Sequence, residues 1–172
     1  MEIKTTIIIP NYNGLSFMEP CFESLKEQTV RDFKVLVVDN GSTDGSVEWL
    51  KEQEIPAIFL PENTGFSGAV NVGLKAAATP YVILLNNDTE LIEEDSIKEM
   101  LGFCQREDVG IAGARLLYGD DTIQHAGVVI GFGGIAGHTF IGLHKAENSY
   151  FHRAMCAQDY SAVTAACLMT KK

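Results

Sequence analysis

The sequence predicts an α/β protein whose mostly parallel sheet is covered by helices on both faces. Apolar strand-like runs alternate with helical stretches over the first two thirds of the chain. The strand-like runs are continuously apolar, which is typical of parallel strands buried on both faces. Several of these runs lead directly into polar loops, and open parallel sheets bind their ligands at the carboxyl ends of their strands.

The predicted elements follow one another in a regular order. The strands are expected where short apolar runs occur, at residues 6–9, 33–38, 57–60, 81–85 and 109–114. The helices are expected between them, at residues 17–27, 45–53, 68–78 and 94–104. Pro10 is expected to stop the first strand.

The rhythm changes after Arg115, where the chain becomes rich in glycine and irregular. We expect hairpins and loops there, followed by a strand-like run at residues 161–169 that reaches almost to the end of the chain. We therefore expect one domain over residues 1–172, whose halves are residues 1–114 and 115–172. The second half is expected to be truncated, because no capping element follows the last run.

Composition is consistent with a cytosolic globular protein. With 172 residues, of which 46% are hydrophobic, the chain can bury a sizeable core. The four cysteines are far apart and lack CxxC spacing, so we expect reduced structural thiols. The longest weakly polar stretch, residues 126–137, is glycine-rich and too short to span a bilayer.

The net charge of the chain limits the classes of molecule that it is expected to bind. A formal net charge of -10 disfavours nucleic acid and anionic lipid, which are bound through basic patches. The same charge would repel a nucleoside diphosphate, unless a divalent cation bridged the two locally. The acidic balance is therefore compatible with a metal-bridged anion and excludes a basic nucleic-acid surface.

The loops after the first two strands carry the first candidate residues. Pro10, Tyr12 and Asn13 follow the first strand, where amide groups could meet a base or phosphate, although the same residues also make ordinary turns. Asp39 ends the second strand, and a carboxylate beside an apolar strand end requires a donor. Residues 42–44 could simply cap the next helix through a side-chain oxygen.

The loop at residues 62–73 mixes glycines with the start of a helix. Glycine permits close approach of the backbone, and a helix start is suited to anions. Ala69 and Gly73 are four residues apart and would make a small-residue face for packing on the sheet. We favour packing for Gly73 and a functional role for Asn71.

The run Asn86, Asn87, Asp88 follows an apolar strand and provides the candidate metal site. Mg²⁺ and Mn²⁺ prefer oxygen ligands and are commonly held by one or two carboxylates together with substrate phosphates. Alternatively, Asp88 caps the following helix. Together with Asp39, these residues predict a metal-dependent nucleotide site at one sheet edge. His125 is expected to be structural, with lining of the site as the alternative.

Four ordered motifs resemble family 2 of the inverting nucleotide-sugar glycosyltransferases, and in particular its rhamnosyltransferase-like branch. They are residues 7–13 (IIIPNYN), 37–44 (VVDNGSTD), 63–71 (NTGFSGAVN) and 84–88 (LLNND). Later segments, at residues 113–115 and 163–169, are also similar to that branch. The resemblance covers nearly the whole chain.

The resemblance implies a GT-A fold, in which a Rossmann-like half, residues 1–114, binds a UDP- or dTDP-linked sugar and an incomplete half, residues 115–172, binds the acceptor. It assigns the nucleoside to Pro10, Tyr12 and Asn13, with Asp39 accepting from a base N–H. It also implies that Gly65, Phe66, Asn71 and Asn87 border the donor. The same resemblance assigns a divalent metal, Mg²⁺ or Mn²⁺, to Asp88.

The implied reaction is a single displacement at the anomeric carbon with inversion, with a glycan or lipid-linked hydroxyl as acceptor. The metal and helix-terminal amides would stabilise the leaving diphosphate. A carboxylate base is needed, and in the family it lies beyond the segment that resembles residues 163–169, so we expect this chain to lack it. Asp120, Asp121 and Asp159 do not match the family's motif for that base.

Other classes of protein are less consistent with the residues. A dehydrogenase would need a GxGxxG turn after the first strand, which is absent. A nucleotidyltransferase would need a basic loop near the N-terminus, and no Lys or Arg lies between Lys4 and Lys26. A non-catalytic nucleotide-sugar-binding or assembly module remains the alternative. By resemblance, the full-length protein would work in the cytoplasm at the inner membrane face, and uncovered apolar surface at residues 162–169 predicts self-association.

Overall fold

The computed structural model describes residues 3–147 and 150–172, so residues 1–2 and 148–149 lie outside the described part of the chain. The chain divides into two units, which we describe separately. The first combines Met1–Ala112 with Ala165–Lys172, and the second is Gly113–Thr164. The sequence groups residues 165–172 with the second half, whereas in the structure they belong to the first unit because they form its strand β10.

A six-stranded sheet forms the centre of the first unit, in the order β3-β2-β1-β4-β10-β5. Its strands are β1 (Thr5–Asn11), β2 (Phe33–Asp39), β3 (Ala57–Phe59), β4 (Tyr81–Leu85), β5 (Ile111–Gly113) and β10 (Cys167–Lys171). The pairs β1/β2, β1/β4 and β2/β3 are parallel, and β10 is antiparallel to β4. The order along the chain reverses between β1 and β4, which is where such sheets place their ligands.

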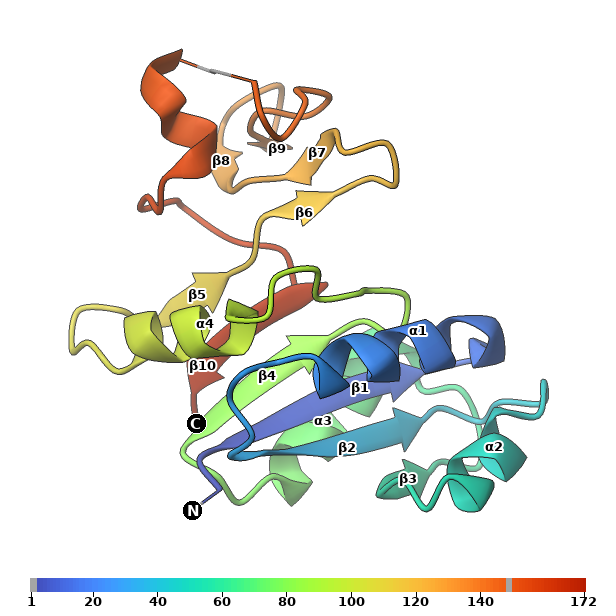
Figure 1. The fold of residues 1–172 in the computed structure, drawn as a ribbon. Helices are drawn as coiled ribbons and strands as arrows, with labels where there is room; N and C mark the ends of the chain where they lie inside the picture. The colour runs from blue at the N-terminus through green and yellow to red at the C-terminus, as the bar shows by residue number, and fades with distance from the viewer. Residues whose placement is uncertain (1–2, 148–149) are drawn as a thin grey trace. The chain divides into compact units, whose positions relative to one another are not determined.

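Helices cover both faces of this sheet, as the sequence predicts (Figure 1). They are α1 (Leu15–Lys26), α2 (Ser46–Glu52), α3 (Gly65–Ala76) and α4 (Ser96–Cys104). In Figure 1, α1 and α4 lie on the near face of the sheet and α3 lies on the far face. The fold is therefore the α/β class with a mostly parallel sheet. None of the described helices is long and apolar enough to span a membrane.

The buried core of the α3 face explains why this helix lies so close to the sheet. Ile8, Val38, Ala69, Ala77 and Val82 form one buried cluster. A Cβ built on Gly73 would lie 2.4 Å from Cγ2 of Ile8, so glycine is the residue that fits at this contact. This supports the packing role that the sequence predicts for Gly73.

The first strand runs further than expected. β1 continues through Pro10 to Asn11, so the prediction that Pro10 stops the strand is wrong. The pairing with β4 covers Thr5 to Ile8, whereas the pairing with β2 continues to Asn11. Pro10 therefore lies on a stretch that is paired on one side, where its missing N–H is tolerated.

Two other boundaries also differ from the sequence prediction. The helix α3 begins at Gly65, three residues before the predicted start at Gly68, so Gly65 and Phe66 belong to its first turn. The last strand begins at Cys167 and not at Ser161. Cys167 and Met169 are fully buried in the sheet, so part of the run predicted to leave apolar surface uncovered is covered by the first unit itself.

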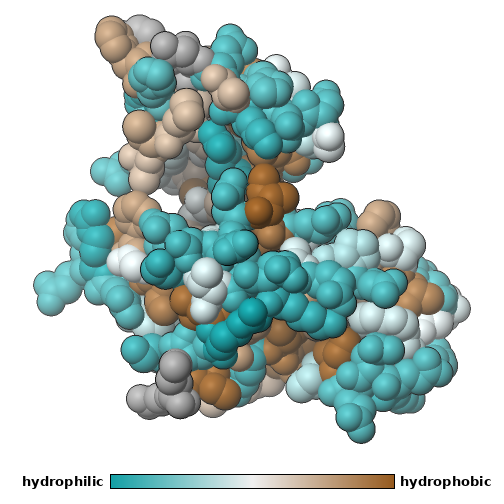
Figure 2. Space-filling view, viewed as in Figure 1, coloured by the Kyte–Doolittle hydropathy of each residue, from teal (hydrophilic) through white to brown (hydrophobic). Residues whose placement is uncertain are grey.

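The second unit contains the short hairpins expected from its glycine-rich sequence. Its strands are β6 (Leu116–Leu117), β7 (Ile123–His125), β8 (Val128–Ile130) and β9 (Ala136–His138), and an irregular 3-10 segment, η1 (Tyr150–Met155), follows. The pairs β6/β7 and β8/β9 are antiparallel. On the face of the molecule in Figure 2, hydrophilic residues predominate and hydrophobic residues form small scattered areas.

Three of the four cysteines have the burial expected of structural thiols. Cys21, Cys104 and Cys167 are buried, Cys156 is exposed, and all of them are free thiols. Burial raises the pKa of Cys167 to about 12. Burial is also the largest cause that raises the pKa of Cys21 to about 12. The two thiols are therefore protonated near neutral pH and act as structural groups.

Candidate functional site

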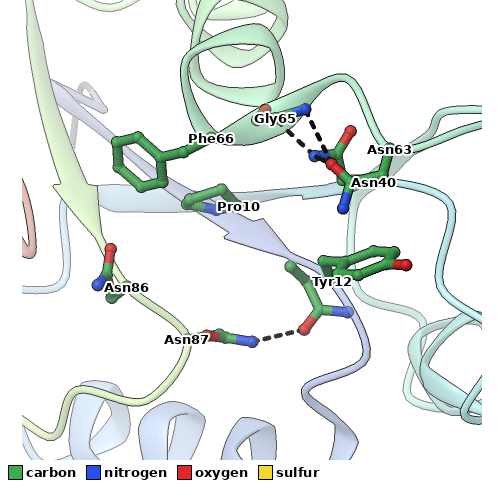
Figure 3. A pocket seen from close by; sticks show the side chains of 9 residues that line it. Pro10, Tyr12, Asn40, Asn63, Gly65, Phe66, Asn86 and Asn87 are labelled. Carbon is green, nitrogen blue, oxygen red and sulfur yellow. Dashed lines mark hydrogen bonds between the residues drawn. The ribbon is translucent and has the colours of Figure 1, made fainter.

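A pocket of about 300 Å³ lies in the first unit at the carboxyl ends of β1, β2 and β4 and at the start of α3 (Figure 3). This is the switch point of the sheet. The residues that line it come from these strand ends and from the first turn of α3: Pro10, Asn11, Tyr12, Asn40, Asn63, Gly65, Phe66, Asn86 and Asn87. Four separate segments of the sequence thus meet at one polar cavity.

A chain of side-chain hydrogen bonds joins the three strand ends below this pocket. Nδ2 of Asn11 donates to Oδ2 of Asp39 at 2.9 Å, and Oδ1 of Asn11 accepts from Nδ2 of Asn87 at 2.7 Å. Nδ2 of Asn11 also donates to Oγ of Ser42 at 3.2 Å. Asn11 and Asp39 are each 1% exposed. Asn11 therefore lies between β2 and the loop that follows β4 and holds both through its amide group.

Gly14 leaves the space that this chain of hydrogen bonds needs. A Cβ built on Gly14 would lie 2.0 Å from Nδ2 of Asn87 and 2.8 Å from Oδ1 of Asn11. Its φ of -117° is accessible to any residue, so the requirement for glycine comes from the contact and not from the backbone.

A second network joins the end of β2 to the start of α3. Nδ2 of Asn40 donates to Oδ1 of Asn63 at 2.9 Å and to the carbonyl of Gly65 at 3.2 Å. Oδ1 of Asn40 accepts from the backbone N–H and the hydroxyl of Thr64. Both donors and both acceptor positions of the Asn40 amide are therefore used within the protein. Asn40 borders the pocket but acts as a structural clamp on the first turn of α3.

Other polar groups of the pocket remain available to a ligand. Within residues 3–147 and 150–172, Nδ2 of Asn63 and the side-chain amide of Asn86 have no hydrogen-bond partner. Two aromatic side chains at the pocket, Tyr12 and Phe66, are 51% and 47% exposed. The cavity thus offers free amide groups together with exposed aromatic surface, which suits a ligand with a flat ring and polar edges.

The structure brings most of the sequence-predicted residues to this pocket. Pro10, Tyr12, Gly65, Phe66 and Asn87 line it.

Asp39, Asn13 and Asn71 are not among the residues that line the pocket. Asp39 contacts Asn11, which does line the pocket, through its Oδ2. Its Oδ1 accepts from the backbone N–H of Ser42 at 3.0 Å. Asn13 joins two loops, because its Oδ1 accepts from the backbone N–H of Thr43 at 2.8 Å. Asn71 is exposed on α3.

Four asparagines that line the pocket lie in the motifs identified in the sequence but were not individually assigned to the donor: Asn11, Asn40, Asn63 and Asn86. Each lies in or directly beside a motif that the sequence did single out. The signal that could have found them is position, since Asn11, Asn40 and Asn86 occur at strand ends and Asn63 lies two residues before the start of α3, where an amide can satisfy backbone groups.

Asp88 follows the pocket residues Asn86 and Asn87 and is exposed. Among the described residues, no group of three or more His, Cys, Asp and Glu side chains could hold a metal ion. The donor set at Asp88 is therefore one carboxylate with neighbouring amide oxygens. Such a set fits an ion like Mg²⁺ that takes its remaining ligands from substrate phosphates and water.

The loop after β2 joins the starts of two helices through Asp44. Its Oδ2 accepts from the backbone N–H of Leu15 at 2.9 Å, and its Oδ1 accepts from the backbone N–H and hydroxyl of Ser46. Burial raises the pKa of Asp44, but these hydrogen bonds outweigh it and lower the pKa below its usual range. The N-cap position of α2 is Gly45, and Asp44, one residue before it, accepts from the first residue of the helix, so the capping alternative for residues 42–44 holds in part through Asp44.

The second unit holds the remaining candidates. His125 is 1% exposed and bonded to groups of its own unit, which supports the structural role expected for it. Asp120 accepts from the backbone N–H and hydroxyl of Thr122, and Asp121 forms an ion pair with Lys145 at 2.9 Å. These contacts explain both acids as parts of the turn between β6 and β7.

Two curated bacterial proteins are similar to nearly the whole chain. The uncharacterized protein y4gI of Sinorhizobium fredii is 38% identical over 97% of this chain and 19% of its own length. The O-antigen biosynthesis protein RfbC of Myxococcus xanthus is 31% identical over 98% of this chain and 14% of its own length. The chain thus spans only a small part of the length of these relatives.

Solved structures show the same fold at lower identity. The mannosyltransferase PcManGT of Pyrobaculum calidifontis, in complex with GDP-Man and Mn²⁺, has a TM-score of 0.61 and 22% identity over 70% of this chain and 37% of its own. Residues 1–349 of TarS from S. aureus, in complex with UDP-GlcNAc, have a TM-score of 0.59 and 24% identity over 66% of this chain and 34% of their own. The fold is therefore that of a GT-A glycosyltransferase. The family model described as glycosyl transferase family 2 matches residues 6–158, and the chain belongs to that family.

Proposed function

We propose that the pocket is the donor site of an inverting, metal-assisted glycosyltransferase. The observation that carries this proposal is the cavity at the switch point. There, Nδ2 of Asn63 and the side-chain amide of Asn86, which have no hydrogen-bond partner among the described residues, lie beside exposed aromatic rings and close in sequence to Asp88. A nucleoside diphosphate sugar has the matching groups, namely a flat base, polar ribose and a charged diphosphate.

We assign the nucleoside to the residues on the β1 and β2 side of the pocket. Tyr12 offers an exposed ring on which a base or ribose can lie. Asp39 accepts from Asn11 and from Ser42, and its remaining lone pairs are the acceptors that the family resemblance assigns to a base N–H. Asn13 holds the loop beside it through Thr43.

We assign the diphosphate and sugar to the side formed by α3 and the loop after β4. Gly65 and Phe66 belong to the first turn of α3 and line the pocket, so the partial positive charge of the helix start faces the same cavity. Asn71 would border the sugar from the same helix. Asp88 would hold the divalent ion, Mg²⁺ or Mn²⁺, which when bound offsets the charge of the diphosphate. The net charge of -10 would repel the diphosphate, and such an ion would offset that repulsion locally.

The donor is proposed from the chemistry of the pocket and from similar proteins. The neighbours were solved with GDP-Man or UDP-GlcNAc, which supports a nucleotide sugar as ligand. We propose a UDP- or dTDP-linked donor and a rhamnosyltransferase-like reaction. The similarity to an O-antigen biosynthesis protein supports a glycan or lipid-linked acceptor. We further propose a cytoplasmic location at the inner membrane face for the whole protein.

The proposed reaction is one displacement at the anomeric carbon, in which the acceptor oxygen attacks as the bond to the diphosphate breaks on the opposite face. The groups of this chain bind and orient the donor for that step, and a carboxylate must take the proton of the acceptor. We assign that role to none of the described acids.

We propose self-association from the exposed apolar side chains of the second unit. These are Ile130, Ile135 and Phe151, which are 68%, 93% and 80% exposed.

Calorimetric titration tests the donor site directly. The chain is titrated with UDP, dTDP and GDP, each with and without Mn²⁺. We expect binding of one of them that strengthens with Mn²⁺, and a loss of about tenfold or more in Asp88→Ala, equivalent to about 1.4 kcal/mol. Glu90→Ala removes an exposed acid two residues away and is the matched control.

The outcomes separate the candidate functions. No binding of any of the three nucleotides contradicts the donor site. Binding that is unaffected by Mn²⁺ and by Asp88→Ala contradicts metal assistance alone. Binding without release of nucleoside diphosphate from a bound sugar nucleotide, in the presence of a glycan acceptor, would favour the alternative of a non-catalytic nucleotide-sugar-binding or assembly module.

A further inference from the structure

The loop that carries Asp88 is attached to the rest of the pocket by few contacts. The parallel pairing of β1 with β4 ends at Ile8 and Leu84, so the loop at residues 86–88 leaves the ladder before it reaches the pocket. The backbone N–H of Asn86 donates to the carbonyl of Ala166 at 2.8 Å, on the side away from β1. Toward β1, the described residues provide the 2.7 Å hydrogen bond from Asn87 to Asn11, and Sγ of Cys21 on α1 lies 4.0 Å from the carbonyl oxygen of Asn86.

The direction of this hydrogen bond is set by the carboxylate at the other end of the chain of contacts. The Asp39 carboxylate only accepts, so the amide of Asn11 must turn its Nδ2 toward Asp39. Its Oδ1 is then left to face Asn87, which must present its own Nδ2. The orientation of Asn87 is therefore determined by Asp39 through Asn11.

The packing around Asn11 shows that this arrangement is built into the fold. Asn11 is 1% exposed and every polar atom of its side chain is used. Gly14 is in van der Waals contact with the same bond, since a Cβ there would lie 2.0 Å from Nδ2 of Asn87. A buried amide with all its partners present holds one conformation, because a rotation would leave buried groups unpaired.

We propose that Asn11 is a positioning residue that couples the two ends of the donor site. Through Asn87 it aligns the loop of Asp88 with Asp39, so that the metal end and the base end of a nucleotide are bound together. This inference rests on the proposed function of the pocket. Partners that orient a metal ligand typically account for about 10–100-fold in metal affinity, so the coupling between metal and nucleotide is the quantity that Asn11 should control.

The test measures that coupling rather than activity. UDP, dTDP and GDP are titrated by calorimetry with and without Mn²⁺. For each variant we compare the ratio of the dissociation constant without Mn²⁺ to the dissociation constant with Mn²⁺. Asn11→Leu keeps the approximate volume and removes the amide. We expect the ratio to fall by about tenfold or more.

A second variant and a control keep the result interpretable. Gly14→Ala has an accessible backbone conformation but its Cβ would displace Asn87, so it should reduce the ratio as well. Thr79→Val removes a buried hydroxyl that bonds to Thr6 at 2.7 Å, next to the opposite ends of β1 and β4. It should lower the melting temperature and leave the ratio unchanged.

The inference and the proposed function fail in different ways. If the unmodified chain binds none of the three nucleotides, the proposed function is wrong and the inference falls with it. If the unmodified chain shows Mn²⁺-dependent binding that Asn11→Leu and Gly14→Ala both retain, the donor site stands and the positioning role of Asn11 is overturned. A melting temperature that falls in Asn11→Leu without a change of ratio would likewise reduce Asn11 to a purely structural residue.

Discussion

Nδ1 of His125 lies 2.9 Å from Nδ1 of His138. Nε2 of His125 accepts from the backbone N–H groups of Gly127 and Thr164, at 3.2 and 3.3 Å. Because Nε2 accepts from both, it carries no proton, so neutral His125 carries its proton on Nδ1 and donates it to His138. The imidazole thus connects β7, β9 and the segment after η1 only in its neutral form.

The stability of the second unit should therefore depend on pH. Burial, and then the neighbouring His138, lower the pKa of His125 from 6.5 to about 4. The unfolded chain then binds more protons than the folded chain between these values, so the stabilisation is complete above pH 6.5 and is lost as pH falls toward 4. We expect the free energy of unfolding to decrease by at most about 1.4 kcal/mol per pH unit in this window.

The measurement has two parts. NMR titration of the imidazole should place the pKa of His125 near 4, and urea denaturation at several pH values should show the loss of stability. His125→Gln should weaken this pH dependence, whereas His144→Gln, which removes an exposed histidine of the same unit, should keep it. A pKa of His125 close to 6.5 would contradict the assignment of a neutral structural histidine.

Asp44 should stabilise the fold through the two helix starts that it joins. Its pKa is lowered in the folded state by hydrogen bonds from Ser46 and Leu15, which outweigh burial. The stabilisation is therefore present above the unfolded pKa of 3.8 and is lost as pH falls through the lower folded value. At pH 7 we expect Asp44→Ala to cost about 0.5–2 kcal/mol, as for loss of a helix cap.

Urea denaturation of the purified variants checks this value. Glu52→Ala removes an exposed acid at the end of α2 and should change the free energy of unfolding by less than about 0.5 kcal/mol. Equal stability of Asp44→Ala and the unmodified chain at pH 7 would show that the Asp44 contacts contribute nothing.

Most of the fold could be predicted from the sequence, because its strands are short apolar runs separated by polar loops. The α/β class, the parallel strands β1 to β4 and the hairpins after Arg115 follow from this pattern. The end of β1 could not be predicted, because tolerance of Pro10 depends on where the pairing with β4 stops. The antiparallel pairing of β10 with β4 could not be predicted either, because the direction of a strand in a sheet is a property of the tertiary structure.

The pocket was predicted less completely than the fold. Pro10, Tyr12 and Phe66 could be found because they lie in loops after apolar strands. The sequence could not show which asparagines are structural and which are available to a ligand, because this depends on which amide atoms already have hydrogen-bond partners. All hydrogen-bonding positions of the Asn40 side chain have partners, whereas the Asn86 side chain has none within the described part of the chain, although the two are the same residue type directly after a strand.

Because every hydrogen-bonding position of the Asn40 amide is used within the protein, we expect Asn40 to contribute to the stability of the fold and not to ligand binding directly. Asn40→Ala leaves the backbone groups of Thr64 and Gly65 without their partner. We expect a cost of about 1–3 kcal/mol in the free energy of unfolding. Asn71→Ala, which removes an exposed asparagine from the same helix, should cost nothing, because alanine has the higher helix propensity. Hydrogen exchange in the first turn of α3 should rise in the Asn40 variant, and unchanged exchange there would contradict the clamp.

The close contact between α3 and β1 predicts that the same substitution, Gly→Ala, destabilises the protein at Gly73 and stabilises it at Gly102. A Cβ on Gly73 would lie 2.4 Å from Cγ2 of Ile8 and 3.2 Å from Cγ2 of Val38, both fully buried. Gly73→Ala must therefore push the helix from the sheet, and overpacking of this kind costs about 1–3 kcal/mol. Gly102 lies within α4 with nothing within 4 Å of a Cβ, so Gly102→Ala should stabilise the protein by about 0.5–1 kcal/mol.

The two substitutions add the same methyl group to a glycine inside a helix, and they differ only in what that group meets. Thermal and urea denaturation should therefore show a lower melting temperature for Gly73→Ala and a higher one for Gly102→Ala. If both variants were stabilised, the sheet would be able to move away from α3 at little cost. The buried cluster around Ile8 would then be loosely packed, and the position of Gly65 and Phe66 at the pocket would not be set by the contact between α3 and β1.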